Sequence, residues 1–196
     1  GDDSLTFEDY LAYDDGTATF DMSLGGNNTF VAGSTAASSS GSLAYTGGTG
    51  EDSLTFGPNL VIDGGTATFD MSLGGSNAFV GGDRAASSSG SLVYTGGSGN
   101  DSLTFGDDLA NGGTATFDMS RGGNNTFVAG SSAASTGGSI AYTGGSGDDS
   151  LTFGTFLAYD NGTATFDMSL GGNNTLVAGT AAASSPSPSG AGGAAS

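Results

Sequence analysis

A segment of 48 or 49 residues occurs four times in succession in this chain. The copies open with GDDSLTF, GEDSLTF, GNDSLTF and GDDSLTF, at Gly1, Gly50, Gly99 and Gly147. A fixed period of this length indicates a repeat architecture, in which each unit buries its apolar face against its neighbours rather than around one central core. We therefore expect function to reside in a surface or an assembly and not in a single pocket.

The composition excludes several kinds of chemistry. The chain contains no His, Cys, Lys or Trp, so thiol nucleophiles, disulfides and Cys/His zinc sites are absent. Acid–base catalysis would have to rest on carboxylates alone, as in a solenoid that hydrolyses polysaccharides. Every unit carries nearly the same acids, and none stands out as a site. We therefore predict that the protein is not an enzyme.

The net charge is -18, and the only basic residues are Arg84 and Arg121. Such a chain repels phosphate backbones and anionic lipid heads, which excludes nucleic acid and membrane-surface partners. No apolar run approaches the roughly 18 residues of a membrane span, so we also expect no membrane insertion. A surface this acidic suits a medium rich in salt or divalent cations. We predict a secreted, extracellular or cell-surface protein.

Strict alternation of apolar and polar residues identifies strands. It runs through TATFDMSL at 17–24, SLTF at 4–7 and SLAYT at 42–46, and returns in the other copies. In NNTFVAG, Phe30 and Val31 are adjacent, and only one of them can face inward. We predict about four short strands per unit, separated by glycine corners and one Ser/Ala-rich stretch, and almost no helix.

Within a unit, DSLTFG resembles NNTFVAG and GTATFDMS resembles GSLAYT, so each unit divides into two related coils. This favours an all-β parallel β-solenoid with two turns per unit, about 38 Å long for eight turns at roughly 4.8 Å each. Four larger turns, or antiparallel hairpins in a sandwich, are the alternatives. The solenoid would comprise units 1–49, 50–98, 99–146 and 147–180, followed by a Ser/Pro/Gly/Ala-rich tail at 181–196.

Stacked copies would bring like residues together as ladders of Phe on Phe, Met on Met and Asn on Asn. The outward aspartates of GTATFDMS favour the two-turn arrangement, because it separates these carboxylates by about 10 Å and salt then screens their repulsion. These aspartates are Asp21, Asp70, Asp118 and Asp167.

A second motif resembles a known family. GGTGEDSLT at 47–55, GGSGNDSLT at 96–104 and GGSGDDSLT at 144–152 match the nonapeptide G-G-x-G-x-D-x-U-x. This is similar to the RTX repeats of secreted bacterial proteins, although here one nonapeptide occurs per unit instead of a tandem array. The resemblance implies a parallel β-roll whose aspartates and neighbouring carbonyls bind Ca²⁺.

Carried onto this chain, the resemblance makes the aspartate of each corner a candidate Ca²⁺ ligand and the glycines its turn formers. The candidate aspartates are Asp3, Asp52, Asp101 and Asp149, with Gly48, Gly50, Gly97, Gly99, Gly145 and Gly147. Ca²⁺ requires six to eight oxygen ligands, and a neighbouring GGNN corner offers no carboxylate. The alternative is that each aspartate caps its glycine turn by bonding to nearby backbone.

Two other surface patterns are present. The Thr-x-Thr pair of GTATF returns in every unit and is similar to ice-binding faces, although ordinary strand propensity also explains outward threonine. The Asn-Asn-Thr segments at 27–29, 124–126 and 173–175 are glycosylation sequons, and an asparagine ladder also explains them.

The sequence predicts a non-catalytic, extracellular structural protein that forms or belongs to a fibre, surface layer, biofilm matrix or adhesin stalk. Its partners would be further copies, stacked through the solenoid ends, and cell-surface or matrix polymers. Ca²⁺ would stiffen the corners. The alternative is a ligand-binding module, either ice-binding or a Ca²⁺-triggered domain of the RTX type.

Overall fold

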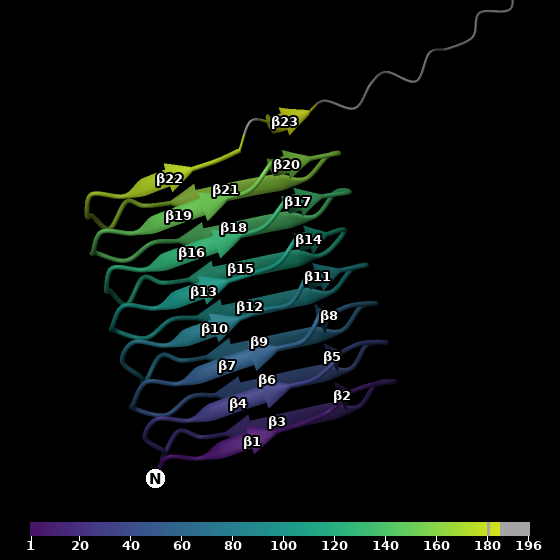
Figure 1. Cartoon of the computed structure of the whole chain (residues 1–196), viewed down its shortest axis with the longest axis vertical. Coiled ribbons are helices and arrows are strands. Elements are labelled where there is room, and N and C mark those ends of the chain that lie inside the picture. Colours follow the sequence, from purple (N-terminus) through teal and green to yellow (C-terminus); the bar gives the residue numbers. More distant parts are fainter. Residues whose placement is uncertain (180, 185–196) are drawn as a thin grey trace, which may run out of the picture.

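The computed structural model describes residues 1–179 and the backbone of 181–184. The chain winds as a coil of parallel strands, and each turn stacks on the one before it (Figure 1). Hydrogen-bonded partners in successive turns, such as Ser4 with Thr29 and Thr29 with Ser53, are 25 and 24 residues apart. The predicted parallel β-solenoid with two turns per sequence unit is therefore confirmed. The described residues include no helix, and hence none that could cross a membrane.

Three strands make one turn, and corresponding strands of successive turns form three parallel sheets. Sheet A contains β1 (Ser4–Thr6), β4 (Thr29–Ala32), β7 (Ser53–Phe56), β10 (Ala78–Val80), β13 (Ser102–Thr104), β16 (Thr126–Ala129), β19 (Ser150–Phe153) and β22 (Thr175–Val177). Sheet B contains β2 (Tyr10–Ala12), β5 (Thr35–Ala37), β8 (Asn59–Val61), β11 (Arg84–Ser87), β14 (Asp108–Asn111), β17 (Ser132–Ser135), β20 (Phe156–Tyr159) and β23 (Ala181–Ser184). Sheet C contains β3 (Thr17–Asp21), β6 (Ser42–Thr46), β9 (Thr66–Asp70), β12 (Ser91–Thr95), β15 (Thr114–Asp118), β18 (Ser139–Thr143) and β21 (Thr163–Asp167).

Turn 1 thus comprises β1 to β3, turn 7 comprises β19 to β21, and turn 8 is described through β22 and β23. Apart from β23, the predicted tail at 181–196 lies outside the described residues.

The prediction of about four strands per unit was wrong, because each of the first three units contributes six. The additional strands belong to sheet B, and their residues do not alternate in burial. In β5, Thr35, Ala36 and Ala37 are all buried. A short run of small buried residues gives no period of two, so sequence reasoning assigned this stretch to a loop.

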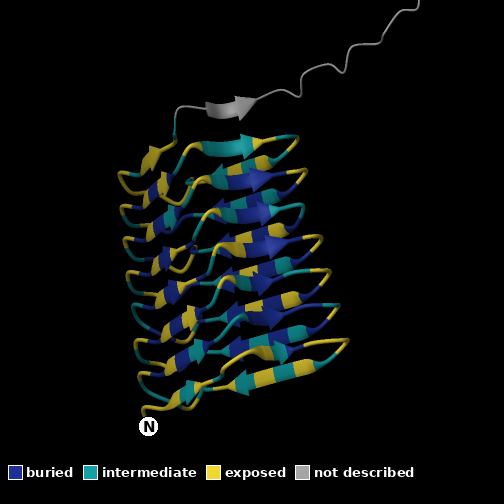
Figure 2. Cartoon of the chain, turned by 45° about the vertical axis from the view of Figure 1, so that its right-hand side comes forward, coloured by how far each residue is buried: buried dark blue, intermediate teal, exposed yellow. Residues whose placement is uncertain are grey.

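Buried positions recur along the strands of the interior turns (Figure 2). Their packing depends on complementary side-chain sizes in neighbouring turns. In sheet C, Ala18 of turn 1 pairs in register with Leu43 of turn 2, which pairs with Ala67 of turn 3. Sheet B has the opposite phase, with Leu60 in turn 3 and Ala85 in turn 4. Each turn thus has leucine at one of these inward positions and alanine at the other. In the next turn the leucine lies in the other sheet.

Sheet A alternates in the same way. Phe30 pairs with Leu54, and Ala32 pairs with Phe56, so the large ring shifts by two positions from one turn to the next. The shifted rings still form one continuous column, whose neighbouring centroids lie 5.3 to 5.8 Å apart. The column consists of Phe7, Phe30, Phe56, Phe79, Phe105, Phe127 and Phe153.

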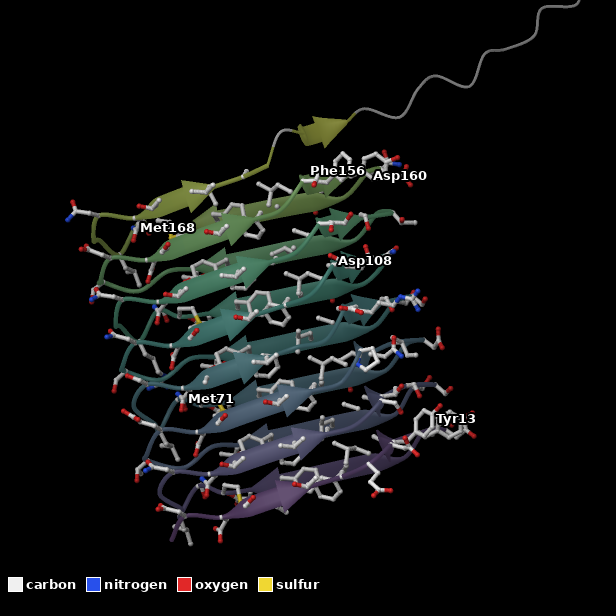
Figure 3. All side chains as sticks on the ribbon, in the orientation of Figure 1. Tyr13, Met71, Asp108, Phe156, Asp160 and Met168 are labelled. Carbon is white, nitrogen blue, oxygen red and sulfur yellow. The ribbon has the colours of Figure 1, made fainter. Side chains whose placement is uncertain are left out.

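The expectation that like residues stack directly on like was therefore wrong. Phenylalanine alternates with leucine in sheet A and with tyrosine in sheet C, as in Phe69 and Tyr94. Met71 likewise faces glycine of the adjacent turns, and a Cβ added to Gly47 would approach its Cε to 2.8 Å. Met71 and Met168 lie on the same side of the solenoid, the left-hand side in Figure 3. At one registered position the same residue therefore returns only two turns later, as Tyr45 and Tyr94 do on either side of Phe69.

The corner between sheets B and C is a tight β-turn in most turns of the coil. Asp14 and Asp15 both have positive φ, 47° and 60°, and the N–H of Gly16 donates to the carbonyl of Tyr13 at 2.9 Å. Two consecutive residues with positive φ define a type I′ turn. In turn 5 this corner is one residue shorter, at Asn111 and Gly112, which accounts for the 48-residue third unit.

The tyrosine hydroxyls in sheet C yield a stability prediction. The hydroxyl of Tyr94 is buried without a hydrogen-bond partner, whereas Phe69 occupies the corresponding position one turn earlier. Since an unsatisfied buried hydroxyl costs about 1–3 kcal/mol, Tyr94→Phe should leave the free energy of unfolding unchanged or raise it by up to about that amount. Chemical denaturation measures this difference.

The reciprocal variant is the control. Phe69→Tyr introduces a fourth hydroxyl into the same column and should destabilise the protein by about 1–3 kcal/mol. Clear destabilisation by Tyr94→Phe would show that the hydroxyl has a partner in solution.

Candidate functional site: the aspartate and asparagine ladder

The corner between sheets C and A brings the nonapeptide aspartates into one column with asparagine. Odd turns place Asp there and even turns place Asn, because DSLTF and NNTFV align in register. From turn 2 to turn 7 these side chains are at most 2% exposed. The column, called the inner ladder, consists of Asp3, Asn28, Asp52, Asn77, Asp101, Asn125, Asp149 and Asn174.

Each buried carboxylate accepts three hydrogen bonds. For Asp52, Oδ1 accepts from the backbone N and from Nδ2 of Asn28, both at 2.8 Å, and Oδ2 accepts from the N of Gly48 at 2.8 Å. Asp101 and Asp149 repeat this arrangement at 2.7 to 3.0 Å. A buried charge is tolerated only where such bonds replace its hydration.

The asparagines complete the column in the same direction. Asn77 Oδ1 accepts from the backbone N of Asp52 at 3.0 Å, and Asn125 Oδ1 accepts from Asp101 at 3.0 Å. Every hydrogen bond between an aspartate and an asparagine of the inner ladder therefore runs from a donor in one turn to an acceptor in the following turn. The ladder has a polarity that runs from turn 1 towards turn 8.

Alternation with asparagine keeps the buried charges apart. Successive aspartates are two turns apart, which is about 10 Å at the spacing of neighbouring strands. Burial raises the pKa of Asp101, while the hydrogen bonds from Asn77 and Gly97 act in the opposite direction. Burial also raises the pKa of Tyr94, and the negative charges of Asp101 and Asp52 add to this effect.

A second column, the outer ladder, lies one residue earlier along the chain and is mostly exposed. Its members are Asp2, Asn27, Glu51, Ser76, Asn100, Asn124, Asp148 and Asn173. Here the backbone N donates to a side-chain oxygen of the preceding turn in turns 2, 3 and 5 to 8, as from Asn27 to Asp2 Oδ1 at 2.9 Å and from Asn124 to Asn100 Oδ1 at 2.7 Å. The outer ladder therefore has the opposite polarity to the inner one.

The predicted corner glycines serve two different purposes. Gly48, Gly97 and Gly145 donate their N–H groups to the aspartate four residues later. Gly50 and Gly99 permit the close approach of neighbouring turns, since a Cβ on either would lie 2.6 Å from a backbone carbonyl carbon of the turn before. Gly147 has the same contact with Gly123.

The four candidate Ca²⁺ ligands lie in this one column but not within one ligand sphere. Asp52, Asp101 and Asp149 already use both carboxylate oxygens, whereas Asp3 is exposed in turn 1. Residues 1–179 contain no group of three or more carboxylates close enough together to hold a metal ion. Ca²⁺ binding at these corners, and with it the RTX resemblance, stays a prediction.

Sequence reasoning missed the pairing of aspartate with asparagine. It aligned DSLTFG with NNTFVAG, and that alignment already places Asp3 over Asn28. The sequence therefore contains the signal, in the alignment of the two half-units and not in the identity of the four full units.

Comparisons with known proteins do not place the chain in a family. It matches no protein-family model, and searches of curated proteins and of solved structures found no match.

The inner ladder yields a second stability prediction. Asp101→Asn replaces an acceptor oxygen by an NH₂ group, so at least one of the donors from Asn77 and Gly97 loses its partner. Each buried donor left unpaired costs about 1–3 kcal/mol, and the free energy of unfolding should fall by that amount or more.

Asp118→Asn is the matched control, because its carboxylate lies on the outer side of sheet C and only one oxygen accepts a bond, from the N of Ser120. It should change stability by less than about 0.5 kcal/mol. Equal effects of the two substitutions in thermal and urea unfolding would contradict a structural role for the buried carboxylate.

Proposed function

We propose that this chain is a non-catalytic structural module, a stiff extracellular rod that forms or belongs to a fibre, surface layer, biofilm matrix or adhesin stalk. The observation that carries the proposal is the inner ladder. The buried nonapeptide aspartates, Asp52, Asp101 and Asp149, have both carboxylate oxygens engaged in hydrogen bonds that hold the turns and corners together.

The rest of the molecule supports the same role. Two hydrogen-bonded polar ladders, three sheets and an aromatic column all run along one axis. A force that stretches the rod along this axis therefore acts on many hydrogen bonds and side-chain contacts between neighbouring turns at the same time. The acidic surface would keep such rods apart in dilute medium and let them approach where salt or divalent cations screen the charge.

Force spectroscopy tests this proposal. A rod held by its two ends should resist extension and then lose whole turns, each releasing roughly 80 Å of chain for 24 residues at about 3.5 Å per residue. Extension without resolved steps would contradict a mechanical role. The same pull in millimolar Ca²⁺ and in chelator tests the metal, since higher unfolding force only in Ca²⁺ would support Ca²⁺ at the glycine corners.

A second candidate is an ice-binding face on sheet C, which one observation favours. Two outward columns of this seven-stranded sheet carry only small uncharged side chains in register. The columns are Thr17, Ser42, Thr66, Ser91, Thr114, Ser139 and Thr163, and Thr19, Ala44, Thr68, Val93, Thr116, Ala141 and Thr165.

Thermal hysteresis distinguishes this candidate from the rod. An ice-binding face should depress the freezing point below the melting point, and Thr116→Tyr, at the middle of the face, should abolish the gap. Thr104→Tyr, on the exposed side of sheet A, should not change it. No hysteresis in the wild-type chain would exclude ice binding.

A further inference from the structure

A groove on the outside of the solenoid, at the corner between sheets A and B, lies apart from both polar ladders. Its volume is about 410 Å³, which is within the range of small-molecule binding sites. Two residues from each of turns 3, 4 and 5 line it, and described turns lie on both sides of these three, so the groove belongs to the interior of the coil. The lining residues are Pro58, Asn59, Asp83, Arg84, Asp107 and Asp108.

The register of sheet B brings opposite charges into this groove without pairing them. Arg84 aligns with Asn59 of the turn before and with Asp108 of the turn after. Within residues 1–179, Asp107 is the one lining residue whose side chain forms a hydrogen bond, and it accepts from Oγ of Ser131 at 2.7 Å. No ion pair joins Arg84 to a carboxylate in this described part of the chain. The groove therefore presents acceptor oxygens and a guanidinium that the fold itself does not use.

The residues at this corner differ from turn to turn, although the turns are otherwise nearly alike. DSLTF and TATFDMS are identical in all four odd turns. Stacking fixes these strands and the two ladders, whereas variation gathered on one side of a repeat protein is typical of its binding face. The corner pairs of turns 1 to 7 are Asp9-Tyr10, Ser34-Thr35, Pro58-Asn59, Asp83-Arg84, Asp107-Asp108, Ser131-Ser132 and Thr155-Phe156.

Two aromatic pairs lie in line with the groove, one on each side of it along the axis. Tyr10 in turn 1 and Phe156 in turn 7 belong to the same registered column of sheet B as the groove residues. Tyr10 packs against Tyr13 and Phe156 against Tyr159, with ring centroids 5.2 and 5.1 Å apart. Tyr13, Asp108 and Phe156 lie on the same side of the solenoid, the right-hand side in Figure 3. Each pair is two turns, about 10 Å, from the nearer end of the groove.

The chemistry of the groove selects a ligand with hydroxyl groups. An anion would meet three carboxylates, and a polycation would leave the Arg84 guanidinium facing like charge. Residues 1–179 contain no group of three acidic side chains close enough together to hold a metal ion. A hydroxyl both donates and accepts, so neighbouring hydroxyls of one sugar satisfy carboxylate, amide and guanidinium together. The aromatic pairs suit the apolar faces of sugar rings.

We propose that this groove binds a neutral polysaccharide that lies along the axis of the rod. Arg84 donates to oxygens of the sugar, and Asp83 and Asp108 accept from its hydroxyls. The bound chain extends from the groove over the aromatic pair of Phe156 and Tyr159. This inference rests on the proposed structural role, and it names the matrix polymer that the rod holds.

Saccharide binding tests the inference directly. An array of neutral oligosaccharides built from glucose, galactose, mannose, xylose and fucose identifies the sugar, and calorimetry with the full 196-residue chain measures its affinity. We expect Arg84→Ala to lower this affinity at least roughly tenfold, because hydrogen bonds from a charged donor are lost. Arg121→Ala is the matched control, since it removes the same exposed charge at the corner between sheets C and A and should bind as wild type does. Circular dichroism checks that each variant retains the coil.

Salt and chain length give two further readouts. The affinity should change by less than roughly twofold between about 0.05 and 0.5 M NaCl, because hydroxyl groups carry no charge to be screened. It should rise as the saccharide is lengthened towards the aromatic pair of turn 7. Phe156→Ser, which copies Ser132 at the same position of turn 6, should abolish that rise.

Other outcomes overturn the inference in distinct ways. No binding to any neutral saccharide of the array excludes it, while the force measurements still decide whether the chain is a rod. Equal affinities of the Arg84→Ala and Arg121→Ala variants would place the sugar site elsewhere. Binding of poly-lysine alone, strengthened by Arg84→Ala and weakened by salt, would make the groove a site for cations. Self-association without sugar that Arg84→Ala abolishes would make the occupant a second copy of this chain.

Discussion

In-register stacking is the constraint on which the rest of this structure depends. A parallel solenoid places corresponding residues of successive turns about 4.8 Å apart, a distance at which two carboxylates repel each other and side chains must be complementary in shape. The chain satisfies this constraint by making neighbouring turns different. Aspartate meets asparagine, phenylalanine meets leucine or tyrosine, leucine meets alanine and methionine meets glycine. The sequence period of 48 or 49 residues, twice the structural one, is the consequence.

The inner ladder adds specificity to this packing. A shift of one residue would turn the inward Leu, Phe and Ala side chains to the solvent face. It would also remove the Asp101 carboxylate from Asn77 and Gly97 and leave it without these partners. Three hydrogen bonds at each aspartate therefore fix how one turn sits on the next. Buried polar groups that are fully satisfied commonly have this effect.

The parts of the fold that could be predicted are those whose local pattern matches their environment. TATFDMS alternates because one side of sheet C faces the core and the other faces water, and its aspartates recur two turns apart as expected. Sheet B gave no such signal, since Ala36 and Ala37 are both buried and small. The inner ladder could be predicted only in part. The sequence indicates which segments align, but not that a buried carboxylate and an amide bond to each other. Nothing in the sequence marks the Tyr94 hydroxyl as unpartnered.

Stability in such a molecule is distributed along one dimension, because each turn contacts only its neighbours. An interior turn is covered on both sides, and Phe79 and Phe127 are almost fully buried there. An edge turn has one side uncovered, and Leu176 and Val177 in turn 8 are about half exposed, at 49% and 51%. Edge turns should thus be the first to open, which is where local unfolding begins in most proteins.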